Sequence, residues 1–372
     1  MELSERAEKW ASTMTGESAA QVTLAHRNST ARVSAASVFD REAREEREAH
    51  FLAPEATRGI GAGNRVVGED PDRYRTCFER DRDRILHASA FRRLAGKTQV
   101  FIFPDDHQRT RLTHALEVAQ VARSVATALG LNVALTEAIA VGHDCGHGPG
   151  GHASEDALTP YVAEGYDHAV WGADVMLTSL NLCRETLDGI RNHSWSRPAP
   201  STPEGEVVSW ADRIAYVCHD FEDAVAAGVV TPEMLPTLVR ERAGTTRSAQ
   251  LHAFITGMIR AAAETGRVGM VPDTAEALAA FRKFNYEHVY LRPAARAQGE
   301  SVVELLRALV EHYADRPHLL GQERAAAVDA GSTDALRVAV TYVAGMTDRY
   351  ACRQAVSLLG WDRSRLPRGI DV

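Results

Sequence analysis

Two histidines and two aspartates occupy positions whose neighbours along the chain are mainly apolar: His114, the adjacent pair His143 and Asp144, and Asp212. A polar group without a partner on an apolar surface is costly, so each residue is expected to bind something specific. Two neutral imidazoles and two carboxylates suit a divalent metal ion, whether Mn, Mg, Fe, Co or Ni. The set leaves coordination positions for water and substrate oxygens. It therefore predicts a catalytic metal site rather than a structural one.

Three predicted helices would hold these residues. In 111–129 apolar residues recur at i, i+3 and i+4, and Gly130 follows as a helix stop. The segment 133–144 is apolar nearly all round, as expected of a buried helix, and it ends at the His-Asp pair. Asp212 lies in a predicted helix over about 207–227, and a buried aspartate is rare unless it is paired or bound to metal.

Each of these residues also has an ordinary structural explanation. A lone helical histidine such as His114 is often a hydrogen-bonded core residue, and a His-Asp pair can cap a helix. Asp212 could pair with an arginine inside a helix bundle. Found together and in this order, the four residues favour the metal site over three separate coincidences.

The remaining pattern predicts an all-α protein. After residue 71 a helical segment runs to Gly96, and no alternating run is long enough for a sheet. Residues 1–70 are interpreted as a peripheral N-terminal segment with an exposed helix at 41–51, 71–230 as the core, and 231–372 as a C-terminal helical region packed on it. Further helical segments are expected at 152–163, 251–264, 273–284, 301–314 and 333–359, and one or two helices at 168–191.

Composition limits the class of protein. The 372 residues are 45% hydrophobic, enough for a large core. No segment reaches the roughly 18 uncharged apolar residues of a membrane helix, so no membrane partner is expected. The N-terminus lacks a signal-peptide core and the five cysteines show no C-x-x-C spacing, which together predict a cytoplasmic protein. The net charge of −8 argues against coating of nucleic acid but allows a local basic pocket.

Three longer segments resemble a known family: RDRDRILHASAFRRLAGKTQVF, RTRLTHALEVAQVAR and HDCGHGPGGHASEDAL. They are similar to the bacterial deoxyguanosine-triphosphate triphosphohydrolases, members of the HD-domain phosphohydrolase superfamily, whose signature is the order H…HD…D. The resemblance is good over 71–227 and absent from about the first 50 residues. It implies an HD-domain helical bundle with additional C-terminal helices. It also implies hydrolysis of a deoxynucleoside triphosphate (dNTP), dGTP first, to deoxynucleoside and inorganic triphosphate.

The same resemblance implies the metal ligands named above and a catalytic group beside them. His152 and Glu155, three residues apart, would share a helix face and act in proton transfer, because a carboxylate orients a neighbouring imidazole and raises its basicity. His147 would lie with them at the phosphate site.

Five residues would contact the substrate by the same resemblance. Arg111 and His168 would face the phosphate chain and Gln99 would lie near the sugar. Tyr216 would pack on the deoxyribose and Asp220 would accept from its 3′-hydroxyl. A purely structural place stays open for His168, Tyr216 and Asp220.

The loop between the His-Asp pair and His152 departs from the common family form. Gly148-Pro149-Gly150 stands where many members have Pro-Pro-Phe, which predicts a more mobile loop and a wider site. Arg92, Arg93 and Lys97 offer further positive charge for a triphosphate, or are solvated at the surface.

Two other functions stay open. An HD site could hydrolyse another nucleotide, such as a nucleoside monophosphate, a cyclic nucleotide or an alarmone. A nucleotide-sensing or single-strand-binding protein is the alternative from another class, although the acidic charge weakens it. Homo-oligomers are expected because family members commonly form them.

Overall fold

The computed structural model describes residues 4–14, 16–104, 107–321 and 328–368, which fall into two compact units, 1–40 and 41–372. The first unit holds α1 (Glu5–Ala11), a hairpin of β1 (Glu17–Ala19) and β2 (Val22–Leu24), and a short 3-10 turn, Ala35–Ser37. The two strands pair antiparallel with Glu17 opposite Leu24. This hairpin was not predicted from the sequence, because strands of three residues are too short to give a periodic signal.

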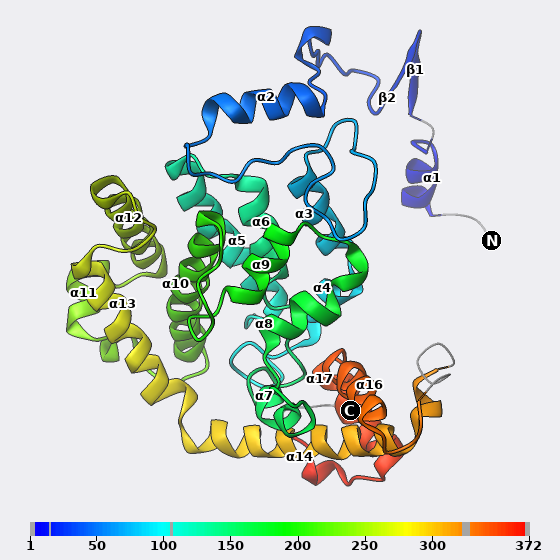
Figure 1. Cartoon of the computed structure of the whole chain (residues 1–372), viewed down its shortest axis with the longest axis vertical. Coiled ribbons are helices and arrows are strands. Elements are labelled where there is room, and N and C mark those ends of the chain that lie inside the picture. The colour runs from blue at the N-terminus through cyan, green and yellow to red at the C-terminus, as the bar shows by residue number, and fades with distance from the viewer. Residues whose placement is uncertain (1–3, 15, 105–106, 322–327, 369–372) are drawn as a thin grey trace. The chain divides into compact units, whose positions relative to one another are not determined.

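The second unit is helical, which confirms the all-α prediction (Figure 1). Its helices are α2 (Arg41–Phe51), α3 (Cys77–His87), α4 (Ser89–Arg93), α5 (Arg111–Leu129), α6 (Val133–Gly142), α7 (Ala153–Leu158), α8 (His168–Trp171), α9 (Arg184–Asn192), α10 (Pro203–Ala226), α11 (Thr237–Ala243), α12 (Arg247–Thr265), α13 (Pro272–Asn285), α14 (Pro293–Asp315), α16 (Thr333–Ala344) and α17 (Asp348–Leu359). Short 3-10 or π turns are Leu94–Gly96, Thr159–Tyr161, Gly172–Met176, Thr178–Leu180, Pro232–Met234, Tyr286–Tyr290, Pro317–Leu320 and Arg363–Arg365.

The helices that hold the predicted metal ligands begin and end at clear sequence signals. Thr110 forms a capping box at the start of α5, and Gly130 ends the helix in the left-handed region at φ 67°. The side chain of Thr202 accepts from the amide of Gly205 and Pro203 takes the first turn of α10. This helix therefore begins before the predicted residue 207.

Two predicted segments each hold two helices in the structure, as was foreseen for 168–191 only. The segment 168–191 holds α8, a π turn, a 3-10 turn and α9, with Asn181 at φ 49° just before α9. The segment 333–359 holds α16 and α17, and the turn between them contains Gly345. Helix α11 was not expected, since seven residues give little more than one period.

Two groups of buried apolar side chains support the fold. The first lies among α3, α5, α6, α10, α12 and α13, and the second among α7, α14, α16 and α17. In Figure 1, α5, α6, α9 and α10 lie side by side, while α14 runs past α7, α16 and α17. Met176 packs against both groups. None of the helices in the described ranges is both long and apolar enough to cross a membrane.

Candidate metal centre and active-site pocket

The structure brings the four predicted metal ligands together. His114 comes from α5, His143 and Asp144 follow the last turn of α6, and Asp212 lies in α10. His114 Nε2 is 3.0 Å from Asp212 Oδ1 and 3.6 Å from Asp144 Oδ2. His143 Nε2 is 3.4 Å from Asp144 Oδ1 and 3.6 Å from Asp212 Oδ1. Only the Asp212 side chain is partly open to solvent, at 22%, so the cluster has one accessible side.

In their neutral, metal-binding forms both histidines would present a lone pair at Nε2, because neighbouring groups hold the ring proton on Nδ1. His143 Nδ1 is 2.7 Å from the carbonyl of Ala140, to which it must donate, and His143 Nε2 is buried without a hydrogen-bond partner in the described residues. His114 Nδ1 is 3.2 Å from His219 Nε2, and His219 Nδ1 is 2.6 Å from Glu117 Oε2. If His219 donates to Glu117, it accepts from His114, whose Nε2 then carries a lone pair.

Two imidazole lone pairs facing two carboxylates repel unless a cation lies among them, so the residues present fit a divalent metal ion. Protons on the imidazoles are the alternative to a metal ion. In that state burial would raise the pKa of Asp144, but the charges of His143 and Arg111 outweigh it and hold the pKa well below its usual value. With the same protonated imidazoles, burial is likewise outweighed at Asp212, where the hydrogen bond from His114 and the charge of His143 lower the pKa. Both carboxylates are therefore ionised.

A second group of polar residues extends from Asp144. Arg111 Nη1 donates to Asp144 Oδ2 at 2.7 Å, and both side chains are buried. His147 Nε2 is 3.2 Å from Asp144 Oδ1, and the His147 ring stacks on the His168 ring with centroids 3.7 Å apart. His168 Nε2 in turn lies 3.2 Å from His193 Nε2. His193 was not among the predicted site residues; its pKa falls to about 3 because of burial and the nearby His143 and His168.

Glu155 contacts His168 more closely than His152. His168 Nδ1 donates to Glu155, whereas His152 Nδ1 is 4.0 Å from the other carboxylate oxygen. Burial would raise the pKa of Glu155, but the neighbouring His152 and His168 outweigh it and lower the pKa. The His152 side chain is 77% exposed and stands at the mouth of the site. Glu155 was expected to pair with His152. It also pairs with His168, which lies thirteen residues after Glu155 in the chain.

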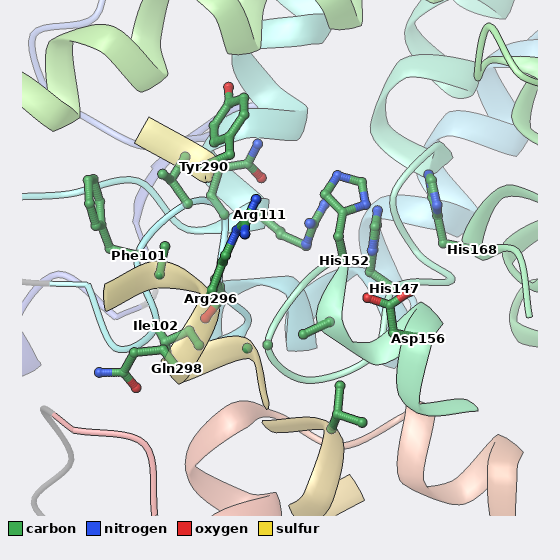
Figure 2. Close-up of a pocket in the computed structure, with 18 of the residues that line it drawn as sticks. Phe101, Ile102, Arg111, His147, His152, Asp156, His168, Tyr290, Arg296 and Gln298 are labelled. Carbon is green, nitrogen blue, oxygen red and sulfur yellow. The ribbon is translucent and has the colours of Figure 1, made fainter. Parts of the chain in front are cut away.

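These groups open into one cavity of about 1460 Å³. Figure 2 shows Arg111, His147, His152 and His168 on one side of it, with Phe101, Ile102 and Gln298 on the other. All five predicted substrate residues line it: Gln99, Arg111, His168, Tyr216 and Asp220.

Tyr216 and Asp220 follow Asp212 at successive turns of α10. The Tyr216 hydroxyl accepts from Arg282 Nε at 2.9 Å, and Asp220 Oδ2 accepts from the Tyr290 hydroxyl at 2.5 Å. Asp220 Oδ1 is buried and has no hydrogen-bond partner in the described part of the chain, although His219 Nε2 lies 3.5 Å from it, and burial raises the pKa of Asp220 to about 7. This oxygen is available to a ligand in the cavity.

Several arginines that sequence analysis missed also line the cavity. Arg213 packs on the ring of Trp195, 3.3 Å from its centroid, and Arg292 packs on Phe101 at 4.8 Å. Neither forms an ion pair with a carboxylate among the described residues, and burial lowers the pKa of both. Arginine stays protonated, so the cavity holds positive charge that the protein does not neutralise. Arg213 directly follows Asp212, which could have served as a signal.

Comparisons with known proteins agree with this site. The HD domain matches residues 111–217, and the phosphohydrolase-associated domain matches 268–356. A deoxyguanosinetriphosphate triphosphohydrolase-like protein of Caldanaerobacter subterraneus subsp. tengcongensis is 40% identical over 84% of this chain and 93% of its own. One from Clostridium perfringens is 38% identical over 77% of this chain and 87% of its own. The chain belongs to the deoxyguanosinetriphosphate triphosphohydrolase-like family. Its HD phosphohydrolase domain makes it a hydrolase, and the predicted family is confirmed.

In this family member the matched HD domain spans all four predicted metal ligands, and the associated domain spans Arg282 and Arg292. The three basic residues before α5 were expected to offer positive charge to a triphosphate or to be solvated at the surface. Lys97 is 2% exposed and does not line the cavity. Arg92 and Arg93 are also absent from its walls.

The glycine loop (Gly148–Gly151) also differs from the expectation of a mobile loop. All four residues are buried. The amide of Gly148 donates to Ser154 Oγ at 3.0 Å, and the amide of Gly150 donates to Asp348 Oδ1 at 2.9 Å. Glycine here permits close packing of the backbone. The burial and the two hydrogen bonds do not agree with the more mobile loop and wider site that the sequence predicted.

Proposed function

We propose that this family member hydrolyses a deoxynucleoside triphosphate, dGTP first, to deoxynucleoside and inorganic triphosphate. The observation that carries the proposal is one cavity with a fitting metal set at one end and unpaired arginines on its other walls. A triphosphate supplies the negative charge that those arginines lack. The name shared by the relatives supports dGTP as the first substrate to test.

His114, His143, Asp144 and Asp212 would hold the divalent ion. A bound ion would polarise a phosphoryl oxygen and lower the pKa of a coordinated water. Arg111, fixed by its hydrogen bond to Asp144, would lie beside the same phosphate and neutralise charge that develops there.

The leaving 5′-oxygen needs a proton. His152 is our candidate donor, because it lines the cavity and its exposed side chain is free to turn toward the substrate. Glu155 would favour the protonated imidazole of either His152 or His168. His147, buried between Asp144 and His168, would keep the phosphate-facing wall in place.

Recognition of the sugar would come from α10. The free Oδ1 of Asp220 would accept from the 3′-hydroxyl, while Tyr290 holds the other oxygen. The Tyr216 ring, tied to Arg282, would pack under C2′ and leave no room for a ribose hydroxyl. Gln99, whose buried Oε1 has no partner among the described residues, would face the sugar from the opposite wall.

The test is metal analysis of the purified protein together with a hydrolysis panel of the four dNTPs, GTP, dGMP and ppGpp. We expect inorganic triphosphate and deoxynucleoside from at least one dNTP, and little turnover of GTP. Release of pyrophosphate with a nucleoside monophosphate would exclude the proposed reaction, because the bond broken would be a different one. Turnover of dGMP or ppGpp alone would favour another HD activity.

A further inference from the structure

Asp348, the first residue of α17, lies far along the chain from the residues given roles above. It is 5% exposed, and its carboxylate accepts three hydrogen bonds. The amide of Gly150 donates to Oδ1 at 2.9 Å, and the amide and hydroxyl of Thr98 donate to Oδ2 at 2.8 and 2.6 Å. Asp348 therefore joins the glycine loop to the segment that begins the opposite wall of the cavity.

The residue before Thr98 makes a second connection. Lys97 Nζ donates to the carbonyl of His147 and, at 2.9 Å, to the carbonyl of Ala344, the last residue of α16. Complete burial, with Arg93 nearby, lowers the pKa of Lys97 to about 7. Through Lys97 and Asp348, the end of α16 and the start of α17 thus contact both ends of the segment 147–150.

Two glycines permit this close approach. A Cβ atom at Gly150, whose φ is +73°, would lie 2.6 Å from a methyl group of Val302 in α14. A Cβ atom at Gly96 would lie 2.8 Å from the methyl group of Thr347, the residue before Asp348. The glycine loop is therefore held between α14 and the α16–α17 turn, and any larger residue would displace one of them.

The residues on either side of this loop are the ones that face the substrate site. His147 precedes it and lies 3.2 Å from Asp144, and His152 follows it at the mouth of the cavity. Asp348 itself does not line the cavity. Its effect on chemistry would come from where it holds the loop.

We propose that Asp348 is a positioning residue, which together with Lys97 forms a clamp that fixes the loop carrying His147 and His152. The phosphohydrolase-associated region thereby acts on the reaction from outside the cavity. The kinetic part of this inference rests on the proposed dNTP hydrolysis, whereas the clamp itself does not.

The test is Asp348→Asn, because a carboxamide has one accepting oxygen where the carboxylate has two. We expect kcat to fall about 100-fold, as a displaced catalytic group can cause, while KM and metal content stay close to wild type. Asp334→Asn, at an exposed aspartate in the first turn of α16, is the matched control and should behave as wild type.

Hydrogen exchange separates the clamp from the activity. In Asp348→Asn the amides of 147–151 should exchange faster than in wild type, while those of α5 should not change. If the wild-type protein hydrolyses no dNTP, the proposed function fails and exchange alone decides the clamp. Unchanged exchange at 147–151 would overturn the inference, as would wild-type kcat in an active enzyme.

Thr98→Val covers the case in which Asp348→Asn does not fold. It removes one of the three hydrogen bonds to Asp348 and keeps the volume and the backbone amide. We expect a loss of kcat of about 10-fold with unchanged KM. A change in KM alone would instead place Thr98 in substrate binding and contradict the clamp.

Discussion

The two sides of the cavity are built in opposite ways. On the side of α5, α6 and α10, His114, His143 and Asp212 present lone pairs and negative charge beside Asp144, which is paired with Arg111. On the side formed by α13 and α14, Arg282 and Arg292 present positive charge, with no carboxylate paired to either in the described residues. The first side attracts a cation and the second an anion, so a metal-bound polyphosphate would satisfy both.

The two sides also differ in what holds them. The metal side is stabilised by contacts within its own helices, such as Glu117 and His219 behind His114. The glycine loop depends on α14 and α17, which lie far along the chain. The predicted metal ligands thus belong to one region. The arginines of the cavity wall and the contacts that position the glycine loop come from the other. Changes on the two sides should therefore give different kinetic signatures.

The largest expected effect is on the metal side. Asp144→Asn removes a charged ligand and the partner of Arg111, so we expect turnover to fall at least about 1000-fold and bound metal to be lost. Elemental analysis, the hydrolysis assay and circular dichroism would measure metal, activity and helix content. Asp83→Asn, on the surface of α3, is the control. Normal metal content with normal turnover in Asp144→Asn would contradict the ligand assignment.

The metal side could be predicted from sequence because its information is local. Apolar periodicity gave α5 to within a residue, and His114 stands inside that pattern. The His-Asp pair directly follows a helix that is apolar nearly all round, as the structure shows. Glu117 could also have been found, since it lies one turn from His114 on the same helix face.

The other side could not be predicted because its contacts join distant segments. Nothing near Asp348 shows that it accepts from Gly150, which is 198 residues away. Glu155 meets His168 only because a turn and a short helix follow α7, and spacing alone paired it with His152. A lysine is usually exposed at the surface, yet Lys97 is buried and its Nζ donates to two backbone carbonyls.

The arginine side should affect substrate binding rather than metal. Arg292→Gln removes an unpaired charge from the cavity wall, so we expect KM for the dNTP to rise about 10- to 100-fold, with metal content unchanged. Steady-state kinetics and elemental analysis measure the two effects separately. Arg260→Gln, which removes an exposed ion pair with Glu264 on α12, is the control and should leave KM unchanged. Loss of metal in Arg292→Gln would show that the two sides are not separate.

A smaller effect is expected behind the metal ligands. Glu117→Gln leaves a neutral group next to His219 and weakens the orientation of His114, so metal affinity should fall about 10-fold. Titration of the metal-free protein would measure the affinity, and excess metal should restore turnover. Glu137→Gln, which alters an ion pair with Arg82 outside the cavity, serves as the control. Failure of excess metal to restore activity would point to a role in the chemical step.

The smallest expected effect concerns Lys97 of the clamp and tests whether its buried amine is charged. The pKa of Lys97 is lowered by burial from the ordinary 10.5 to about 7, so above pH 7 the folded chain binds fewer protons than the unfolded chain. The free energy of unfolding of wild type, relative to Lys97→Met, should therefore rise by about 1 kcal/mol for each pH unit above 7, level off near the ordinary lysine pKa, and be flat below 7. Urea denaturation of both proteins between about pH 6 and 9 gives this difference. A difference that stays flat throughout would mean that the ammonium remains charged and is compensated by Asp348, which would make the clamp an ion pair rather than a neutral hydrogen-bonded contact.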